Sequence, residues 1–161
     1  MRMFRIFRFV LLAMLITMVL AVVASAGSVV NAPTASPVYF IGSVKTVSGD
    51  AYLVRGKARS SAAVGDHLYQ GDTLVTASSS SIGVIFRDDT ILSLGPRSEV
   101  RIDEFVFNPA DGAMAFLANV GKGTAQFITG QMSKIAPERM NVETPLATIG
   151  IRGTRFLVKV D

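Results

Sequence analysis

Hydrophobic residues recur at every second position along most of the chain beyond its N-terminal segment. In residues 82–87, Ile82, Val84 and Phe86 alternate with positions of different character, and residues 99–107 show the same alternation. A period of two places the apolar side chains on one face of a β-strand, whereas an amphipathic helix has a period near 3.6. The pattern therefore predicts strands with one buried face and indicates no long amphipathic helix.

Clusters of glycine, aspartate, asparagine, serine and proline separate the apolar runs and are typical of turns. The result is about ten short strands at a spacing of roughly 8 to 12 residues, which favours an antiparallel architecture. We therefore predict an all-β fold, a single antiparallel β-sandwich or β-roll. Runs 38–47 and 51–54 indicate an opening hairpin, and runs 114–120 and 124–128 indicate another hairpin around residues 121–123.

Six phenylalanines fall within predicted strands. We expect them to anchor one hydrophobic core, because large aromatic side chains bury much apolar surface. They are Phe86, Phe105, Phe107, Phe116, Phe127 and Phe156. A core filled in this way leaves little buried volume for a cofactor, and the sequence predicts none.

The N-terminal segment has the three parts of a secretory signal peptide. Three arginines precede an apolar run at residues 9–23, which ends in the small residues Ala24, Ser25 and Ala26. This run is shorter than the ~20 residues that a membrane-spanning helix needs. We therefore predict a signal-peptide helix at residues 1–26, with cleavage after Ala26 at a site formed by Ala24 and Ala26.

The segment after the signal peptide indicates where the folded domain begins. Residues 27–37 are small, polar and interrupted by proline, and they predict a short tether before a domain at residues 38–161. Cleavage predicts a periplasmic or secreted protein. The alternative is that residues 9–30 remain uncleaved as an inner-membrane anchor, and only in that case do we expect contact with a membrane.

Charge narrows the class of protein further. The 161 residues include 16 Lys and Arg and 12 Asp and Glu, and three of the arginines lie in the predicted signal peptide. The rest of the chain lacks the clustered basic and aromatic residues of a nucleic-acid-binding surface, so we expect no nucleic-acid partner. Arg152 and Arg155 form only a small basic spot, which we interpret as a solvated face.

The residue types that most enzymes and metal sites need are scarce. The chain has no cysteine and a single histidine, His67, which excludes thiolate and poly-histidine sites. Asp66, Asp72, Asp88 and Asp89 lie in turns, but their spacing matches no calcium-binding loop. Aspartate in a turn normally accepts hydrogen bonds from its own backbone. We predict no metal site, no catalytic residue and no enzymatic activity.

Several ordered motifs give the chain a resemblance to a known family. They are GDHLYQGDTLVT at residues 65–76, FRDDT at 86–90, LGPRSEV at 94–100, VETP at 142–145 and GIRGTRFLV at 150–158. As a set they resemble the FecR domain family, from about Ile41 to Val160. The family motif positions in this chain are Gly65, Asp66, Gly71, Asp72, Leu74, Thr76, Asp88, Pro96, Ser98, Thr144, Pro145, Gly153, Thr154 and Phe156.

The resemblance implies an all-β periplasmic domain that works by protein contact and has no catalytic residues. The regulator that gives the family its name receives a signal from an outer-membrane receptor and controls a sigma factor through a cytoplasmic segment. Only eight residues precede the apolar run here, so we do not expect sigma-factor control from this chain. The family turn usually has the sequence Asp-Gly-Ser or Asp-Gly-Thr, and the replacement of its glycine by Asp89 affects only local turn geometry.

Exposed strand edges suggest how such a domain functions. The edge of a sheet can accept a strand from another protein through main-chain hydrogen bonds. We therefore predict a domain for envelope signal sensing or relay, with an envelope protein as partner and a contact at strand 140–144 or at strand 154–160. An alternative is an envelope scaffold or glycan-binding module, for which Tyr39, Tyr52 and Tyr69 are the only tyrosines.

Overall fold

The computed structural model describes residues 39–153 and 155–161. The predicted signal peptide, its cleavage residues Ala24 and Ala26, the tether and the motif residue Thr154 lie outside these residues. In the part of the chain that is described, no helix is long and apolar enough to cross a membrane.

The described residues form twelve strands and three short helical segments, which confirms the predicted all-β class. The strands are β1 (Gly42–Ser48), β2 (Ala51–Arg55), β3 (Ala58–Ser61), β4 (His67–Leu68), β5 (Thr73–Thr76), β6 (Ser81–Phe86), β7 (Ile91–Leu94), β8 (Glu99–Asn108), β9 (Ala113–Ile128), β10 (Met140–Thr144), β11 (Ala147–Gly150) and β12 (Arg155–Val160). The helical segments are η1 (Pro109–Asp111), α2 (Met132–Ile135) and η2 (Pro137–Arg139).

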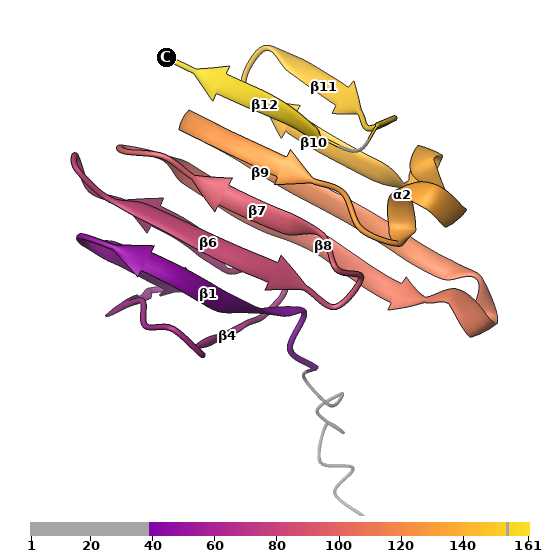
Figure 1. The fold of residues 1–161 in the computed structure, drawn as a ribbon, viewed down its shortest axis with the longest axis horizontal. Coiled ribbons are helices and arrows are strands. Elements are labelled where there is room, and N and C mark those ends of the chain that lie inside the picture. Colours follow the sequence, from indigo (N-terminus) through magenta and orange to yellow (C-terminus); the bar gives the residue numbers. More distant parts are fainter. Residues whose placement is uncertain (1–38, 154) are drawn as a thin grey trace, which may run out of the picture. The chain divides into compact units, whose positions relative to one another are not determined.

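The strands form two sheets that share β9 (Figure 1). Sheet A has the order β4-β1-β6-β7-β9-β12, and sheet B has the order β3-β2-β5-β8-β9-β10-β11. The first part of β9 pairs with β8 and β10, and its last part pairs with β7 and β12. All pairs are antiparallel except β9 with β10. Because β9 joins sheets A and B, the described strands together form one curled, mostly antiparallel sheet, in agreement with the predicted roll or sandwich.

The continuity of β9 corrects one predicted hairpin. The two runs predicted as partners belong to one strand of 16 residues, because the ladder continues through Lys122, opposite Glu99, and Gly123, opposite Val160. Gly123 has a φ of +82°, a conformation that favours glycine, and the buried side chains change there from even-numbered to odd-numbered positions. The glycine segment is therefore a bend between two sheets instead of a hairpin turn.

The predicted opening hairpin is also wrong, since β1 and β2 lie in different sheets. Gly49, with a φ of +70°, and Asp50 form a corner between the sheets. The Asp50 amide donates a hydrogen bond to Ser80 Oγ at 2.8 Å, which ties this corner to the loop before β6. The alternation of apolar and polar residues does not predict β3, because all four of its residues are exposed and the strand has no buried face.

Phenylalanines form the core between the sheets. Four of the six predicted anchors are buried, namely Phe86, Phe105, Phe116 and Phe127. The other two, Phe107 and Phe156, are partly buried and pack against the core. The Phe116 ring is in edge-to-face contact with three other buried rings, one from β6, one from β8 and one from the end of β9. These rings come from both sheets, so aromatic contacts hold the sheets together.

Candidate functional site

Buried polar side chains at several motif positions hold the turns between strands. Asp72 is fully buried, and its carboxylate accepts hydrogen bonds from Arg55 Nε and Nη2, at 2.8 Å each. The Tyr69 amide donates a third hydrogen bond to this carboxylate at 2.9 Å. The hydrogen bond to Asp72 raises the pKa of Arg55 above its ordinary value, so the guanidinium stays charged. Asp72 is therefore a turn residue held by a bidentate ion pair.

Removal of either partner tests how this ion pair stabilises the turn. We expect Arg55→Ala to lower the free energy of unfolding by about 3 kcal/mol, because it leaves a buried carboxylate without its cation. Asp72→Ala should cost less, about 2 kcal/mol, since a hydrated arginine can remain. The Arg55 side chain is 55% exposed, which permits that hydration. Urea denaturation gives both values, and a larger loss for Asp72→Ala would contradict this explanation.

A second buried aspartate fastens the segment after β9 to the β6–β7 turn. The Asp88 carboxylate accepts hydrogen bonds from the Thr90 amide at 3.1 Å and the Thr90 hydroxyl at 2.7 Å. The Thr90 hydroxyl in turn accepts from the Gly130 amide at 2.9 Å. Asp89 has a φ of +66°, and its carboxylate accepts from Gln131 Nε2 at 2.7 Å. The turn therefore keeps the left-handed conformation that glycine would adopt, and the aspartate adds a contact.

Thr76 and Ser98 form a third buried group beside the bend of β9, and the motif residue Pro96 lies exposed in the turn before Ser98. Thr76 Oγ1 donates a hydrogen bond to the Gly95 carbonyl at 2.6 Å and accepts one from the Ser98 amide at 2.9 Å. The Ser98 hydroxyl accepts from the Thr124 amide at 2.9 Å and lies 3.1 Å from the Thr124 carbonyl. Ser98 thus supplies the polar contacts that the backbone of β9 needs where it passes from sheet B to sheet A.

The first motif contains turn residues and one core residue besides those already described. Gly65 and Gly71 have φ values of +98° and +86°, which glycine adopts without strain. The Asp66 carboxylate accepts a hydrogen bond from the Ala63 amide at 2.8 Å. Leu74 is fully buried in the core. These positions define turns and packing, and none of them points to a ligand.

The last motif positions lie near the C-terminal strands. Thr144 is the last residue of β10 and Pro145 begins the turn to β11, and both line a surface groove. The Gly153 carbonyl accepts a hydrogen bond from the Thr129 hydroxyl at 2.6 Å, and the Phe156 ring stacks on a core phenylalanine. The structure thus distributes the motif positions over several turns and does not bring them together in one site.

The structure also places the residues considered for metal and sugar binding. Within residues 39–153 and 155–161, no group of three or more His, Cys, Asp or Glu side chains is arranged to hold a metal ion. Arg59 lies over the Tyr52 ring at 3.8 Å, and Arg55 lies over the Tyr69 ring at 4.3 Å. One face of each of these two rings is therefore occupied by a guanidinium and is not free to stack on a sugar.

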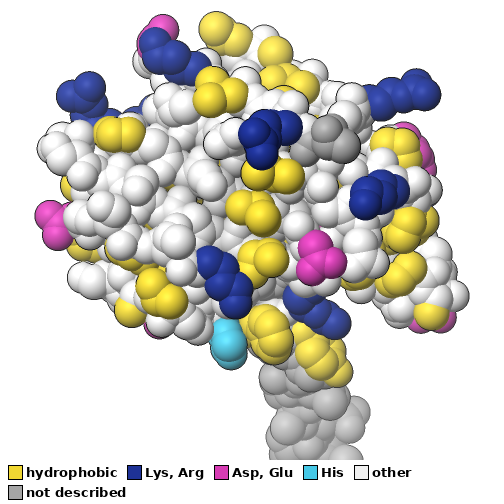
Figure 2. Space-filling view, viewed as in Figure 1, with side chains coloured by type: hydrophobic (Ala, Val, Ile, Leu, Met, Phe, Trp, Pro, Cys, Tyr) yellow, Lys and Arg dark blue, Asp and Glu magenta, His cyan; other side chains and the backbone are white. Residues whose placement is uncertain are grey.

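The outer face of sheet A has a line of apolar side chains that crosses the strands (Figure 2). The register places Ile85, Ile91 and Ile128 side by side on β6, β7 and β9. At the far edge of the same sheet the His67 ring stacks on Phe40, with ring centroids 4.5 Å apart. Cross-strand pairs of β-branched residues stabilise antiparallel sheets, which gives this line a structural explanation.

Four of the described strands lie at sheet edges: β4 and β12 in sheet A, and β3 and β11 in sheet B. β12 is the longest, with six residues, and pairs along its whole length with β9. β10 lies between β9 and β11, so the prediction that residues 140–144 offer an edge is wrong. The C-terminal strand, by contrast, has one edge without a partner strand in the described part of the chain.

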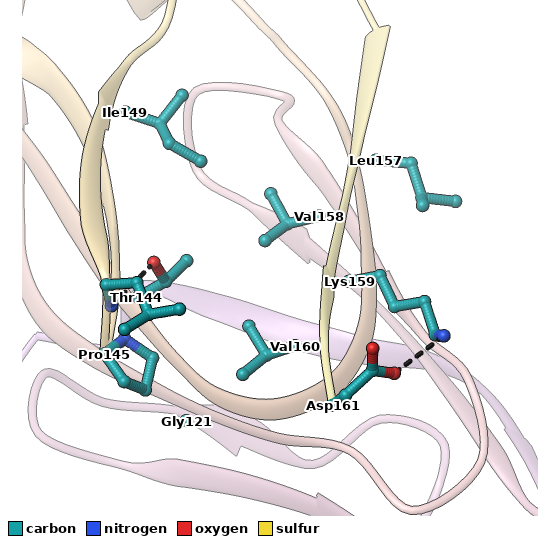
Figure 3. Close-up of a pocket in the computed structure, with 10 residues that line it drawn as sticks. Gly121, Thr144, Pro145, Ile149, Leu157, Val158, Lys159, Val160 and Asp161 are labelled. Atoms are coloured by element: carbon teal, nitrogen blue, oxygen red, sulfur yellow. Dashed lines mark hydrogen bonds and ion pairs between the residues drawn. The ribbon is translucent and has the colours of Figure 1, made fainter.

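A surface groove lies between β11 and β12 (Figure 3). Its larger part has a volume of about 680 Å³, and a second part of about 250 Å³ continues along the start of β12. Ile149, Val158 and Val160 point into the space between the strands, whereas Leu157 and Lys159 point away from it. Sequence alternation does not reveal this groove, because its two walls, β11 and β12, belong to different sheets. They are connected only indirectly, since β12 and β10, the neighbour of β11, both pair with β9.

The fold and these surfaces define a small all-β domain whose motif residues stabilise turns and whose C-terminal strand has a free edge. Residues 72–161 match the family described as FecR protein, and the chain belongs to this family. The match begins at Asp72, after the first part of the motif at residues 65–76. Membership indicates a role in signal regulation. No curated protein and no solved structure shows significant similarity to the chain.

Proposed function

We propose that this chain is an exported, non-enzymatic domain that relays a signal in the cell envelope by binding a partner protein at the free edge of β12. Family membership supports the regulatory role, and the predicted signal peptide supports export to the periplasm. The observation that carries the proposal is a free edge that borders a groove with an apolar lining.

The edge of β12 is well suited to accept an added strand. Natural sheets protect their edges by short strands, bulges or proline. The opposite edge of sheet A is short, since β4 has two residues, whereas β12 has six residues, no proline and an uninterrupted register with β9. Leu157 is 62% exposed beside this edge. β12 therefore presents unpaired main-chain groups and apolar surface to a partner.

A strand added to β12 would extend sheet A into the groove. Its side chains would alternate between the two sides of the sheet, because successive residues of a strand point in opposite directions. Those on the groove side would meet Ile149, Val158 and Val160, and those on the other side would meet Leu157. Main-chain hydrogen bonds would supply affinity, and the side-chain contacts would supply specificity.

Site-specific photo-crosslinking in the producing cells tests this proposal. A photoreactive amino acid replaces Leu157 in one variant and Leu146, which lines the groove from the β10–β11 turn, in another. Val64 is the matched control, because its side chain is 65% exposed and that of Leu157 is 62% exposed. Val64 lies outside the groove. We expect one discrete envelope-protein adduct from position 157, beside the edge of β12, and from position 146, in the groove, and none from the control.

The adduct must also map to a defined segment of the partner. We expect the crosslinked peptide to come from one extended segment, and a synthetic copy of that segment to protect β12 amides from hydrogen exchange. Equal adducts from positions 157, 146 and 64, or a partner segment that leaves β12 unprotected, would overturn the proposal.

A further inference from the structure

We infer that the groove between β11 and β12 takes an extended peptide segment that runs antiparallel to β12 and has carboxylates at its C-terminal end. This inference rests on the proposed function and names the chemistry of the partner. Three properties of the groove lead to it: its apolar middle, the unequal charge of its two ends and the direction of β12.

The middle of the groove is apolar over the length of β12. Ile149 and Val158 line both parts of the groove, so the two parts are continuous. Val158 and Val160 occupy alternate positions of β12 and point to the same side. A segment paired with this strand therefore needs apolar side chains at every second residue, over about six residues or 20 Å.

The two ends of the groove differ in charge. Arg152 and Arg155 line the end where β12 begins, and both residues are exposed. Neither guanidinium forms an ion pair with a side chain among the described residues. At the opposite end the Lys159 ammonium is 2.7 Å from the Asp161 carboxylate, so its charge is compensated. The free charge of the groove is therefore positive and lies at one end.

The direction of β12 and the position of the two arginines together indicate which end of the partner segment carries the carboxylates. β12 runs from Arg155 to Val160, and both neighbours of β9 within sheet A pair with it in antiparallel fashion. A segment that continues this antiparallel arrangement ends beside Arg155. Carboxylates on its last residues, or a free C-terminus, would then face the two arginines, and arginine binds carboxylates well because its geometry permits two parallel hydrogen bonds.

An appended hairpin tests the inference in the full chain. A two-residue Asn-Gly turn after Asp161 favours a type I′ hairpin, which makes the following strand antiparallel to β12. The appended strand is Thr-Val-Thr-Val-Thr-Val-Glu-Glu, whose seventh residue lies opposite Arg155 in the hairpin register. One control has two glutamines at its end, and a second has the two glutamates moved to its first two positions. Tethering raises the effective concentration of the strand to the millimolar range, so weak pairing becomes measurable.

Protection of β12 amides from hydrogen exchange is the measurement. We expect the strand with terminal glutamates to protect them about five- to tenfold more than either control at low salt, the size of two exposed ion pairs. Arg152→Gln together with Arg155→Gln should abolish this difference. Arg87→Gln removes an exposed arginine outside the groove and should leave it unchanged.

The outcomes separate the inference from the proposed function. If all three strands protect β12 equally, the edge accepts a strand and the charge preference is wrong. Better protection by the strand with glutamates at its start would overturn the placement of the carboxylates at the C-terminal end of the segment. If none of the three protects β12, the edge does not accept a strand, and the proposed function fails together with the inference.

Discussion

Phe116→Ala should lower the free energy of unfolding by about 4 kcal/mol, because removal of a fully buried aromatic side chain loses apolar burial and leaves a cavity. Phe116 is 1% exposed, and its ring centroid lies 5.3 Å from that of Phe86 in sheet A. It also lies 6.2 Å from the ring of Phe105 in sheet B and 6.3 Å from that of Phe127. Loss of this ring therefore weakens the packing of both sheets at once.

Urea denaturation of the full chain measures this loss, with Phe107→Ala as the control. Phe107 is a predicted core anchor of the same residue type, but it is only partly buried and packs at the margin of the core. Its replacement should cost about 1 to 2 kcal/mol, because less apolar area returns to water. Equal losses for the two variants would show that Phe116 is not the centre of the core.

Gly130→Ala should lower the free energy of unfolding by about 3 kcal/mol, since overpacking a tight site forces the backbone to shift. A Cβ atom at Gly130 would lie 2.0 Å from the Asp88 carbonyl oxygen and 2.5 Å from the Thr90 nitrogen. Both are backbone atoms of the β6–β7 turn, so no side-chain rotation relieves the clash. The contact that fastens the segment after β9 to this turn would be lost.

Gly121→Ala is the matched control for this effect. A Cβ atom at Gly121 would have its nearest neighbour at 3.8 Å, an ordinary contact distance. The free energy of unfolding of this variant should therefore differ from that of the wild-type chain by no more than about 0.5 kcal/mol. Thermal and urea denaturation of both variants give the comparison. A Gly130→Ala variant as stable as Gly121→Ala would contradict the close approach between the segment after β9 and the β6–β7 turn.

Local sequence signals predict most strands and the core of this protein. The alternation of apolar residues finds β6 and β8, and the phenylalanines at alternate positions are the residues that pack between the sheets. The turn between β6 and β7 follows from Asp88, Asp89 and Thr90, because short polar residues hydrogen-bond their own backbone. These features depend on neighbours in the sequence, so the sequence is sufficient to predict them.

The errors arise where a long-range contact decides the structure. Glycines at positions 121 and 123 resemble a hairpin turn, but pairing with β8 on one side and β12 on the other keeps β9 continuous. Likewise Gly49 marks a corner, because Ser80, distant in sequence, binds the next amide. Propensity indicates that the chain bends at such glycines, and tertiary pairing determines the direction of the bend.

The candidate site also combines features that have a local sequence signal with features that depend on long-range contacts. The sequence motifs identify residues such as Asp72 and Ser98, which the structure shows to be buried supports of turns. The groove and the free edge have no local signal, because they depend on how β10 and β12 attach to opposite parts of β9. Arg55, which holds Asp72, lies 17 residues away from it and belongs to no motif.

Crosslinking from Leu157 compared with Val64 is the most direct test of the central claim, that a partner protein binds at the edge of β12. The two side chains have similar exposed fractions, 62% and 65%, so random collisions should label both equally. We predict a discrete envelope-protein adduct from position 157 and none from position 64. The same adducts from both positions, or none from position 157 in cells that produce the intact protein, would contradict the proposed recognition edge.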